Sequence, residues 1–453
     1  MHKHKCLIII LLLVFGTVYC QNEVLDAYIK EGLASNLALQ QKKLDYQKSL
    51  LALREAKGMF YPDVSLKARY TVAEGGRIIT FPIGDLLNPV YSTLNLLTMT
   101  EQFPTVDNEE FPFYRPREQE TKLSLVQPIY NSQLIGNVKV KKEYSELMYT
   151  SVDMYKRELI REIKTAYYNY QNAHYMNRII DTTFTLVNEN LRLSQRLFNN
   201  SVVTRDVVYR SESEISKVEV EKANAQKMLN VSRAYFNFLL NRQLEEPIEL
   251  KLEDPPPFVS TLEDAKLLAL ENREELQLIS KTLNMNSRQL NIQKGSNIPS
   301  LFGVVDYGFQ GEEYQFTSDD DFILASLVLQ WNIFHGMTEK NSRSQTRIEG
   351  EKLREALSEA EQKIQMQVIT SYYTVLSAYK SIASAKKQLT SSRKAYYMIE
   401  RKYEEGQANL LEFIDARTSF TTSYSGYFIA LNQYLISLAE FESATASADL
   451  TKF

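Results

Sequence analysis

The chain has 453 residues, of which 44% are hydrophobic, 24% charged and 11% aromatic. This length and composition suffice for a folded protein of several ordinary domains. The formal net charge of −4 is too small to indicate binding to nucleic acid or another polyanion. Both cysteines, Cys6 and Cys20, lie in the first 20 residues, so a chain without this segment has neither a disulfide nor a cysteine-ligated metal site.

Residues 1–20 have the composition of a secretory signal peptide. A basic start precedes an apolar run from Leu7 to Phe15, which is too short to span a bilayer as a permanent helix. Cleavage after Cys20 would remove the whole segment. The alternative is lipoprotein processing with Cys20 acylated, although Tyr19 is bulky where that processing favours a small residue.

The first structural repeat is expected over residues 21–244. Apolar residues at helical spacing predict its helices, and alternation of apolar with polar residues predicts its strands. The expected elements are, in order, helix 23–57, strand 64–72, strand 121–130, long helix 131–200 and helix 202–241. Residues 73–118 hold five prolines and are expected to form a long exposed loop between the two strands.

Two very long helices organise the predicted fold. Residues 131–200 contain no proline and one glycine, and their three-four apolar spacing predicts a coiled-coil helix of roughly 105 Å. Residues 336–405 repeat the pattern, with an apolar residue at every seventh position. Adding 205 to a position in the first helix gives its counterpart in the second, so Tyr167-Tyr168 corresponds to Tyr372-Tyr373. We therefore interpret the chain as an internal duplication.

A proline-rich linker, residues 245–261, joins the two repeats. The second repeat, residues 262–453, is expected to follow the order of the first and to end in a short tail. Its predicted elements are helix 262–294, strands 301–310 and 322–334, long helix 336–405 and helix 408–445. The overall expectation is a mainly α fold with a small β part, built from a duplicated helix–strand–strand–helix–helix unit.

The four predicted strands suggest how the protein meets a membrane. No segment after the leader has 18 consecutive apolar residues, so no transmembrane helix is expected. The strand at 64–72 instead has one apolar face of about the length that crosses a bilayer when tilted. Four strands cannot close a barrel, and open strand edges are unstable in lipid. We therefore expect several chains to pool their strands in one transmembrane β-barrel, with the long helices forming a tube below it.

The order of these elements and several short motifs resemble the TolC-like outer-membrane channels of bacterial efflux and type I secretion. The resemblance covers nearly all of residues 24–446. The most specific motif is residues 401–416, which resemble the family's Arg-x-Tyr-x-x-Gly turn followed by an acidic helix start. Supporting motifs are Ala269-Leu270-Glu271-Asn272-Arg273-Glu274-Glu275-Leu276, Pro299-Ser300-Leu301 and Trp331-Asn332-Ile333-Phe334-His335-Gly336.

The resemblance implies a homotrimer whose pooled strands close a barrel in the outer membrane. Its helices would form an α-barrel tunnel across the periplasm, with the linker and the C-terminal tail in a belt around the middle. The implied function is a passive exit duct that receives cargo from an inner-membrane transporter through a periplasmic adaptor. The implied partners are copies of the chain, that adaptor and transporter, and outer-membrane lipid, with no cofactor.

The resemblance also implies a pore constriction. Glu412 and Asp415 match acidic residues that ring the closed inner end of the tunnel, where a threefold axis would bring six carboxylates together. Such a ring favours cations. The alternative is an ordinary acidic helix start, which the helix dipole stabilises.

Gate contacts are implied near the same turn. Tyr403 matches a tyrosine that ties the helical hairpins together, whereas the arginine often found two residues after Gly406 is replaced by Ala408. In the first repeat, Arg205 and Asp206 are candidates for a tie across the hairpins, and a solvated turn is the alternative.

Three other features bear on function. Trp331, beside a strand, is a candidate membrane-interface anchor, with an ordinary strand tryptophan as the alternative. Beyond the leader the only histidines are His174 and His335, and no glycine-rich phosphate loop or set of metal ligands accompanies them, so no enzyme activity is expected. The alternative functions are a periplasmic coiled-coil adaptor and a structural or surface-binding protein that uses residues 73–118.

Overall fold

The computed structural model describes residues 23–251, 254–448 and 450–452, so the predicted signal peptide and Cys20 lie outside the described residues. The chain divides into two compact units. The first contains the described part of Met1–Ser49, together with Glu143–Asn284 and Gly350–Phe453, and the second contains Leu50–Lys142 and Met285–Glu349. Among the described residues, none of the helices combines the length and the hydrophobicity needed to cross a bilayer.

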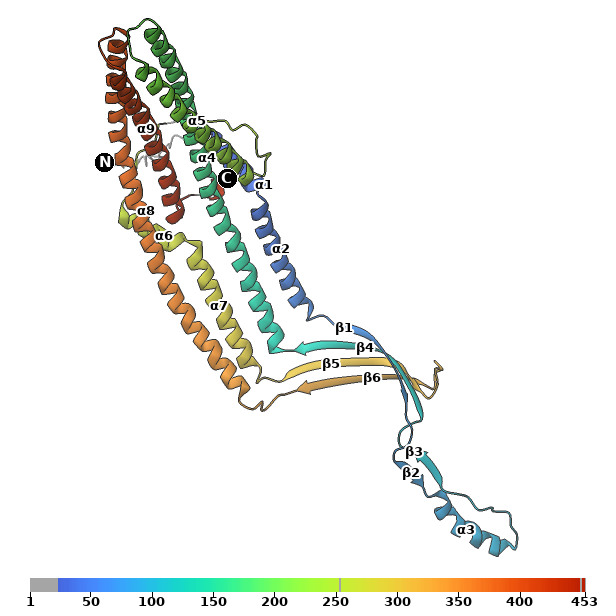
Figure 1. Cartoon of the computed structure of the whole chain (residues 1–453). Helices are drawn as coiled ribbons and strands as arrows, with labels where there is room; N and C mark the ends of the chain where they lie inside the picture. Colours follow the sequence, from blue (N-terminus) through green and yellow to red (C-terminus); the bar gives the residue numbers. More distant parts are fainter. Residues whose placement is uncertain (1–22, 252–253, 449, 453) are drawn as a thin grey trace, which may run out of the picture. The chain divides into compact units, whose positions relative to one another are not determined.

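The order of elements confirms a mainly helical, duplicated fold with a small β part (Figure 1). The first repeat contains α1 (Glu23–Ser35), α2 (Leu37–Gly58), β1 (Asp63–Val72), β4 (Arg117–Tyr130), α4 (Ser132–Asn199) and α5 (Arg205–Leu239). The second contains α6 (Leu262–Asn272), α7 (Glu274–Gly295), β5 (Ser300–Gly311), β6 (Asp321–Gln330), α8 (Thr338–Glu404) and α9 (Leu410–Ala444), followed by the short η1 (Leu450–Lys452).

Each helix predicted before the strands is interrupted once, which corrects the expectation of single helices over 23–57 and 262–294. The interruptions, at Asn36 and Arg273, are equivalent in the two repeats. The Asn36 amide donates to the Leu239 carbonyl at 2.9 Å, and Arg273 Nη1 donates to the Ala444 carbonyl at 3.1 Å. Leu239 and Ala444 end α5 and α9, so each interruption supplies a side chain to the unpaired carbonyls of a helix end.

Residues 73–118 are not a single irregular loop, which also corrects the prediction. Strands β2 (Ile78–Phe81) and β3 (Glu109–Pro112) pair in antiparallel fashion, and α3 (Ile83–Thr98) lies between them in sequence. Most of the prolines that suggested a loop stand at or beside element ends, where proline is tolerated, and one, Pro89, lies inside α3. Pro82 is the residue before α3, and Pro112 ends β3.

The last predicted strand is shorter than expected, because β6 ends at Gln330 rather than at residue 334. Gly336 and Met337 have positive φ angles of 56° and 65°. This left-handed backbone is incompatible with a strand and turns the chain before α8 begins at Thr338.

The second unit contains a four-stranded antiparallel sheet in the order β1-β4-β5-β6, so β4 of the first repeat pairs with β5 of the second (Figure 1). The register aligns Leu66 with Leu123, Leu123 with Tyr307, and Tyr307 with Ile323. These four side chains share one face and are 73%, 48%, 47% and 74% exposed, respectively. Within the described chain, the sheet therefore has a solvent-exposed apolar face and two outer strands, β1 and β6, that pair on one side only.

The opposite face of the sheet carries ion pairs. Lys122 Nζ lies 3.0 Å from both Glu120 Oε1 and Asp306 Oδ2, and Ser124 Oγ donates to Asp306 Oδ1 at 2.6 Å. Strand β6 departs from this pattern, because the apolar residues Leu324 and Val328 lie on the polar side of the sheet.

The first unit contains two large apolar cores, one for each repeat. Tyr167 and Phe236 are fully buried in the first core, and Val368 and Tyr434 are fully buried in the second. Tyrosine hydroxyls hold the linker against both cores: that of Tyr167 accepts from the Lys251 amide at 3.1 Å, and that of Tyr434 donates to the Pro256 carbonyl at 2.6 Å.

A largely buried ion pair joins the repeats in the first unit. Arg157 of α4 donates from Nε to both carboxylate oxygens of Glu274 at 3.0 Å and from Nη2 to Oε1 at 2.8 Å. Its Nη1 donates to the Ala448 carbonyl at 3.0 Å. Arg157 therefore links the long helix of the first repeat to α7 and to the C-terminal tail.

Candidate functional site: the ends of the helical hairpins

Two helical hairpins, α4–α5 and α8–α9, form the candidate site in the first unit (Figure 1). Each turn contains one residue with positive φ: Ser201 at 57° and Gly406 at 73°. Their backbone bonds correspond, since Val202 N donates to Leu197 O at 2.9 Å and Gln407 N to Lys402 O at 2.7 Å. Ser201 therefore occupies the left-handed position that glycine fills in the second repeat.

The two predicted pore carboxylates lie in the first turns of α9. Glu412 forms a capping box with Asn409: its backbone N–H donates to Asn409 Oδ1 at 3.0 Å, and its Oε2 accepts from the Asn409 N–H at 3.2 Å. The carboxylate of Glu412 thus stabilises the start of the helix. Asp415 is solvent-exposed one turn further on. The pore role of the pair stays a prediction.

Tyr403 connects the two hairpins within the chain. Its ring stacks on that of Phe413, with centroids 4.9 Å apart and an interplanar angle of 21°. Burial raises the pKa of Tyr403, and a hydrogen bond with the side chain of Ser194 opposes that effect. Because Ser194 belongs to α4, the residue that the resemblance singled out does contact the first hairpin.

The contacts that the structure shows for Arg205 and Asp206 are all with residues nearby in the sequence. The Arg205 guanidinium lies 5.5 Å from the centre of the Tyr209 ring, and Asp206 Oδ2 lies 3.8 Å from Arg210 Nε. Both partners are on α5 itself. The structure does not bring these two residues to Tyr403, and their predicted part in a gate remains untested.

An inter-hairpin ion pair that sequence reasoning missed lies near the same ends. Arg417 of α9 pairs with Glu214 of α5, and their side chains are only 5% and 13% exposed. The sequence did contain an indication that Arg417 is unusual, because it is the only basic residue between Leu410 and Ala444. Its partner could not be found from spacing, because the two residues are far apart in the sequence.

The hairpins also pack against each other further from their turns. The Tyr175 and Phe428 rings stack with centroids 4.4 Å apart, and Lys164 Nζ lies 2.5 Å from Glu442 Oε2. Helix α9 therefore contacts the first hairpin along most of its length. The Arg417–Glu214 pair is the most deeply buried ionic contact on this path.

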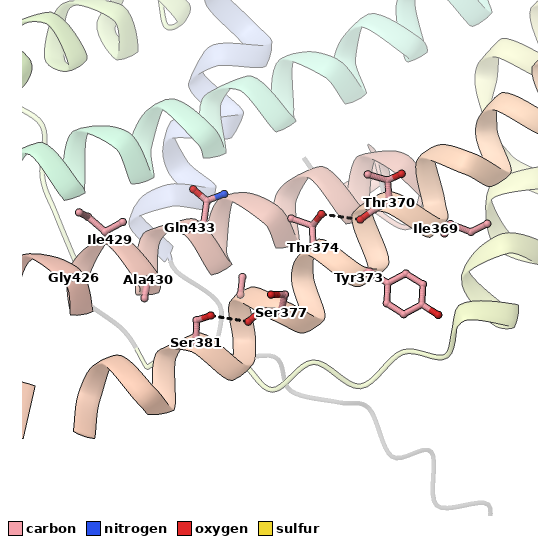
Figure 2. Close-up of a pocket in the computed structure, with 11 residues that line it drawn as sticks. Ile369, Thr370, Tyr373, Thr374, Ser377, Ser381, Gly426, Ile429, Ala430 and Gln433 are labelled. Carbon is pink, nitrogen blue, oxygen red and sulfur yellow. Dashed lines mark hydrogen bonds between the residues drawn. The ribbon is translucent and has the colours of Figure 1, made fainter. Parts of the chain in front are cut away.

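A groove of about 780 Å³ lies between α8 and α9 (Figure 2). Small residues such as Gly426, Ala430 and Ser377 contribute to its lining. The hydroxyls of Thr374 and Ser381 donate back to carbonyls of their own helix at 2.8 and 2.9 Å. The groove is therefore suited to packing against apolar side chains rather than to binding a polar ligand.

Trp331 stands just beyond the end of β6 in the second unit. Its indole Nε1 donates to the Asn297 carbonyl at 3.1 Å, while the side chain is 56% exposed. An interfacial anchor needs this combination of a satisfied N–H and an exposed ring. Its role as an anchor stays a prediction.

The fold and the paired helical hairpins are similar to those of TolC-like outer-membrane channels. Residues 267–447, which make up most of the second repeat, match the protein family described as "Outer membrane efflux protein". This match confirms the resemblance found in the sequence motifs and agrees with the predicted location, the outer membrane. No curated protein matches the sequence significantly.

Solved outer-membrane channels share the fold over nearly the whole chain. The CmeC channel of Campylobacter jejuni matches with a TM-score of 0.75 and 12% identity, over 95% of this chain and 88% of that one. The open state of the MtrE channel of Neisseria gonorrhoeae matches with a TM-score of 0.72 and 15% identity, over 93% and 88%. VceC of Vibrio cholerae matches with a TM-score of 0.72 and 11% identity, over 93% and 95%.

Proposed function

We propose that the chain is one subunit of a trimeric exit duct in the outer membrane. It takes cargo from an inner-membrane transporter through a periplasmic adaptor and conducts it out of the cell without chemistry. The observation that carries this proposal is the sheet of the second unit, which combines an exposed apolar face, a charged opposite face and two half-paired outer strands. In lipid, such strands are stable only when another chain pairs with them.

The opposite faces of the sheet fit the two environments of a barrel wall. Side chains such as Leu66 and Ile323 would contact lipid, and the ion pairs around Lys122 would contact water inside the barrel. The groove between α8 and α9 fits a helix of a neighbouring subunit in the same assembly. A periplasmic adaptor would have no use for an exposed apolar sheet, which makes that alternative the weaker one.

The first prediction concerns this assembly. Mild detergent extraction of the outer membrane is expected to yield a complex of three chains, because β1 and β6 each need a partner strand. Native mass spectrometry of the purified protein measures the number of chains. A chain that is extracted intact and stays monomeric at all concentrations would refute the proposal.

The second prediction concerns the carboxylates of α9. Glu412→Gln with Asp415→Asn is expected to lower the cation-over-anion permeability ratio several-fold in planar bilayers, because it removes six charges from the pore of a trimer. Glutamine at 412 preserves the capping box, so the helix start is retained. Glu440→Gln, near the other end of α9, is the matched control and should leave the ratio unchanged. An unaltered ratio in the double variant would exclude the pore role.

A further inference from the structure

The segment between β1 and β4, residues 73–116, carries a structured element, α3, that the proposed duct does not use. We call this segment the insert. Helix α2 precedes β1 and helix α4 follows β4, so the helices and the insert are attached to opposite ends of these strands (Figure 1). The insert therefore faces the outside of the cell when the helices lie in the periplasm, a placement that rests on the proposed function.

Side-chain amides fix α3 against the chain that returns from it. Asn88 exchanges two hydrogen bonds with the backbone of Val106, both at 2.9 Å. Asn95 does the same with Phe103, at 2.8 and 3.0 Å. At Gly84 the two segments are so close that a Cβ would lie 2.2 Å from the Val106 carbonyl oxygen. Contacts within the insert therefore fix the position of α3 without another protein.

The outer side of α3 is apolar and uncovered. Leu86, Val90 and Leu97 fall on one helical face, and they are 68%, 51% and 74% exposed. Leu96, beside this face, is 79% exposed, and Met99, the residue that follows α3, is 94% exposed. Folding of the insert does not bury these side chains, and a cluster of exposed apolar residues on a rigid helix is typical of an interaction surface.

The charges of the insert indicate which kind of molecule could bind the exposed face of α3. It contains six acidic residues, two arginines and no lysine, a net charge of 2 − 6 = −4. Helices that lie on membrane surfaces carry basic residues that attract anionic lipid, so a lipid surface fits poorly. A second copy would place like charges together, which is unfavourable. The remaining complement is a protein whose apolar patch is bordered by lysine and arginine.

We propose that the exposed face of α3, defined by Leu86, Val90 and Leu97, docks an extracellular protein through an apolar patch bordered by basic residues. The leucines supply the buried centre of the contact. The carboxylates of the same insert attract the basic residues of the partner and select it by charge. The exposed acidic residues of the insert are Glu74, Asp85, Glu101, Asp107, Glu109 and Glu110.

The test is photo-cross-linking in intact cells that express the full chain. A photoreactive amino acid replaces Thr93, which is exposed between Val90 and Leu97 on the same face. The matched control places it at Ser92, which is also exposed but which helical spacing directs away from that face. The expected result is one discrete adduct with a different protein from position 93, weaker by about ten-fold or more from position 92.

Two sets of substitutions then test the chemistry of the surface. Leu86→Ser with Val90→Ser and Leu97→Ser should reduce the adduct about ten-fold or more, and Glu101→Lys with Asp107→Lys and Glu109→Lys should do the same. The purified partner should bind the unaltered chain and not these variants. An adduct of two copies of the chain, an adduct with lipopolysaccharide, no adduct, or an adduct unaffected by charge reversal would each overturn the proposal.

An epitope inserted between Gly75 and Gly76 separates this proposal from the proposed function. Both glycines are exposed and have positive φ angles, 77° and 105°, in a turn. Antibody binding to intact cells together with the absence of an adduct would refute only the docking surface. Antibody binding that requires a permeabilised outer membrane would refute both the docking surface and the proposed orientation of the duct.

Discussion

Replacing Arg417 by leucine is expected to destabilise the hairpin ends by about 3 kcal/mol, because it leaves the Glu214 carboxylate buried without its counter-charge. The two side chains are only 5% and 13% exposed, so water cannot replace the lost partner. The free-energy loss should appear as a lower melting temperature of the purified protein, followed by circular dichroism.

The same substitution should also alter conductance. The Arg417–Glu214 pair ties α9 to α5 close to the turns, where the resemblance to TolC-like channels implies the closed end of the proposed duct. Loss of the tie should let the hairpins separate, so single channels of Arg417→Leu in planar bilayers should show a larger conductance than those of the unaltered protein.

Two further variants make this result decisive. Arg192→Leu removes an ion pair with Glu189 on α4 whose side chains are 71% and 60% exposed, so it should cost less than about 1 kcal/mol. The double variant Arg417→Leu with Glu214→Leu should recover stability relative to Arg417→Leu, because no unpaired charge is left behind. Equal losses of stability for Arg417→Leu and Arg192→Leu would show that the buried ion pair does not hold α9 against α5.

Gly308→Val is expected to reduce the amount of assembled oligomer in the outer membrane by about ten-fold or more. A Cβ at Gly308 would lie 2.4 Å from the Thr121 carbonyl oxygen and 2.7 Å from Lys122 Cα. These are backbone atoms of the paired strand β4, which cannot move aside without breaking the β4–β5 register. The band of heat-modifiable oligomer on gels of outer-membrane fractions measures the effect.

Gly303→Val is the matched control in the same strand. The nearest atom to a Cβ there is Ile129 Cδ1 at 3.6 Å, an ordinary contact with a flexible side chain. This variant should assemble at normal levels, since valine also favours strand backbone. A normal oligomer band for Gly308→Val would mean that the sheet does not have this register in the assembled protein.

Most of the helical and strand content was predictable from local spacing. The duplication was visible because the long helices keep the same apolar pattern at a separation of 205 residues. The interruptions at Asn36 and Arg273 were not visible, because the apolar spacing continues across them. They depend on hydrogen bonds to Leu239 and Ala444, which are distant in sequence.

The insert is a second case in which contacts distant in sequence decided the local structure. Its prolines predicted a loop, since proline weakens both helices and strands in their interiors. The structure contains α3 instead, held by the amides of Asn88 and Asn95 against the returning chain. Asparagine is a common loop residue, so these two residues gave no indication of a helix.

By itself the sequence determined the class of fold, the duplication, the two long helices and the amphipathic first strand, because these follow from the spacing of apolar residues along one segment. Through the motif at residues 401–416, it also indicated Tyr403 as a candidate contact between the hairpins. Only the tertiary structure decided the order of the strands, the pairing of Arg417 with Glu214 and the uncovered face of α3. Each of these depends on which distant segments meet, and periodicity within a segment carries no information about its partners.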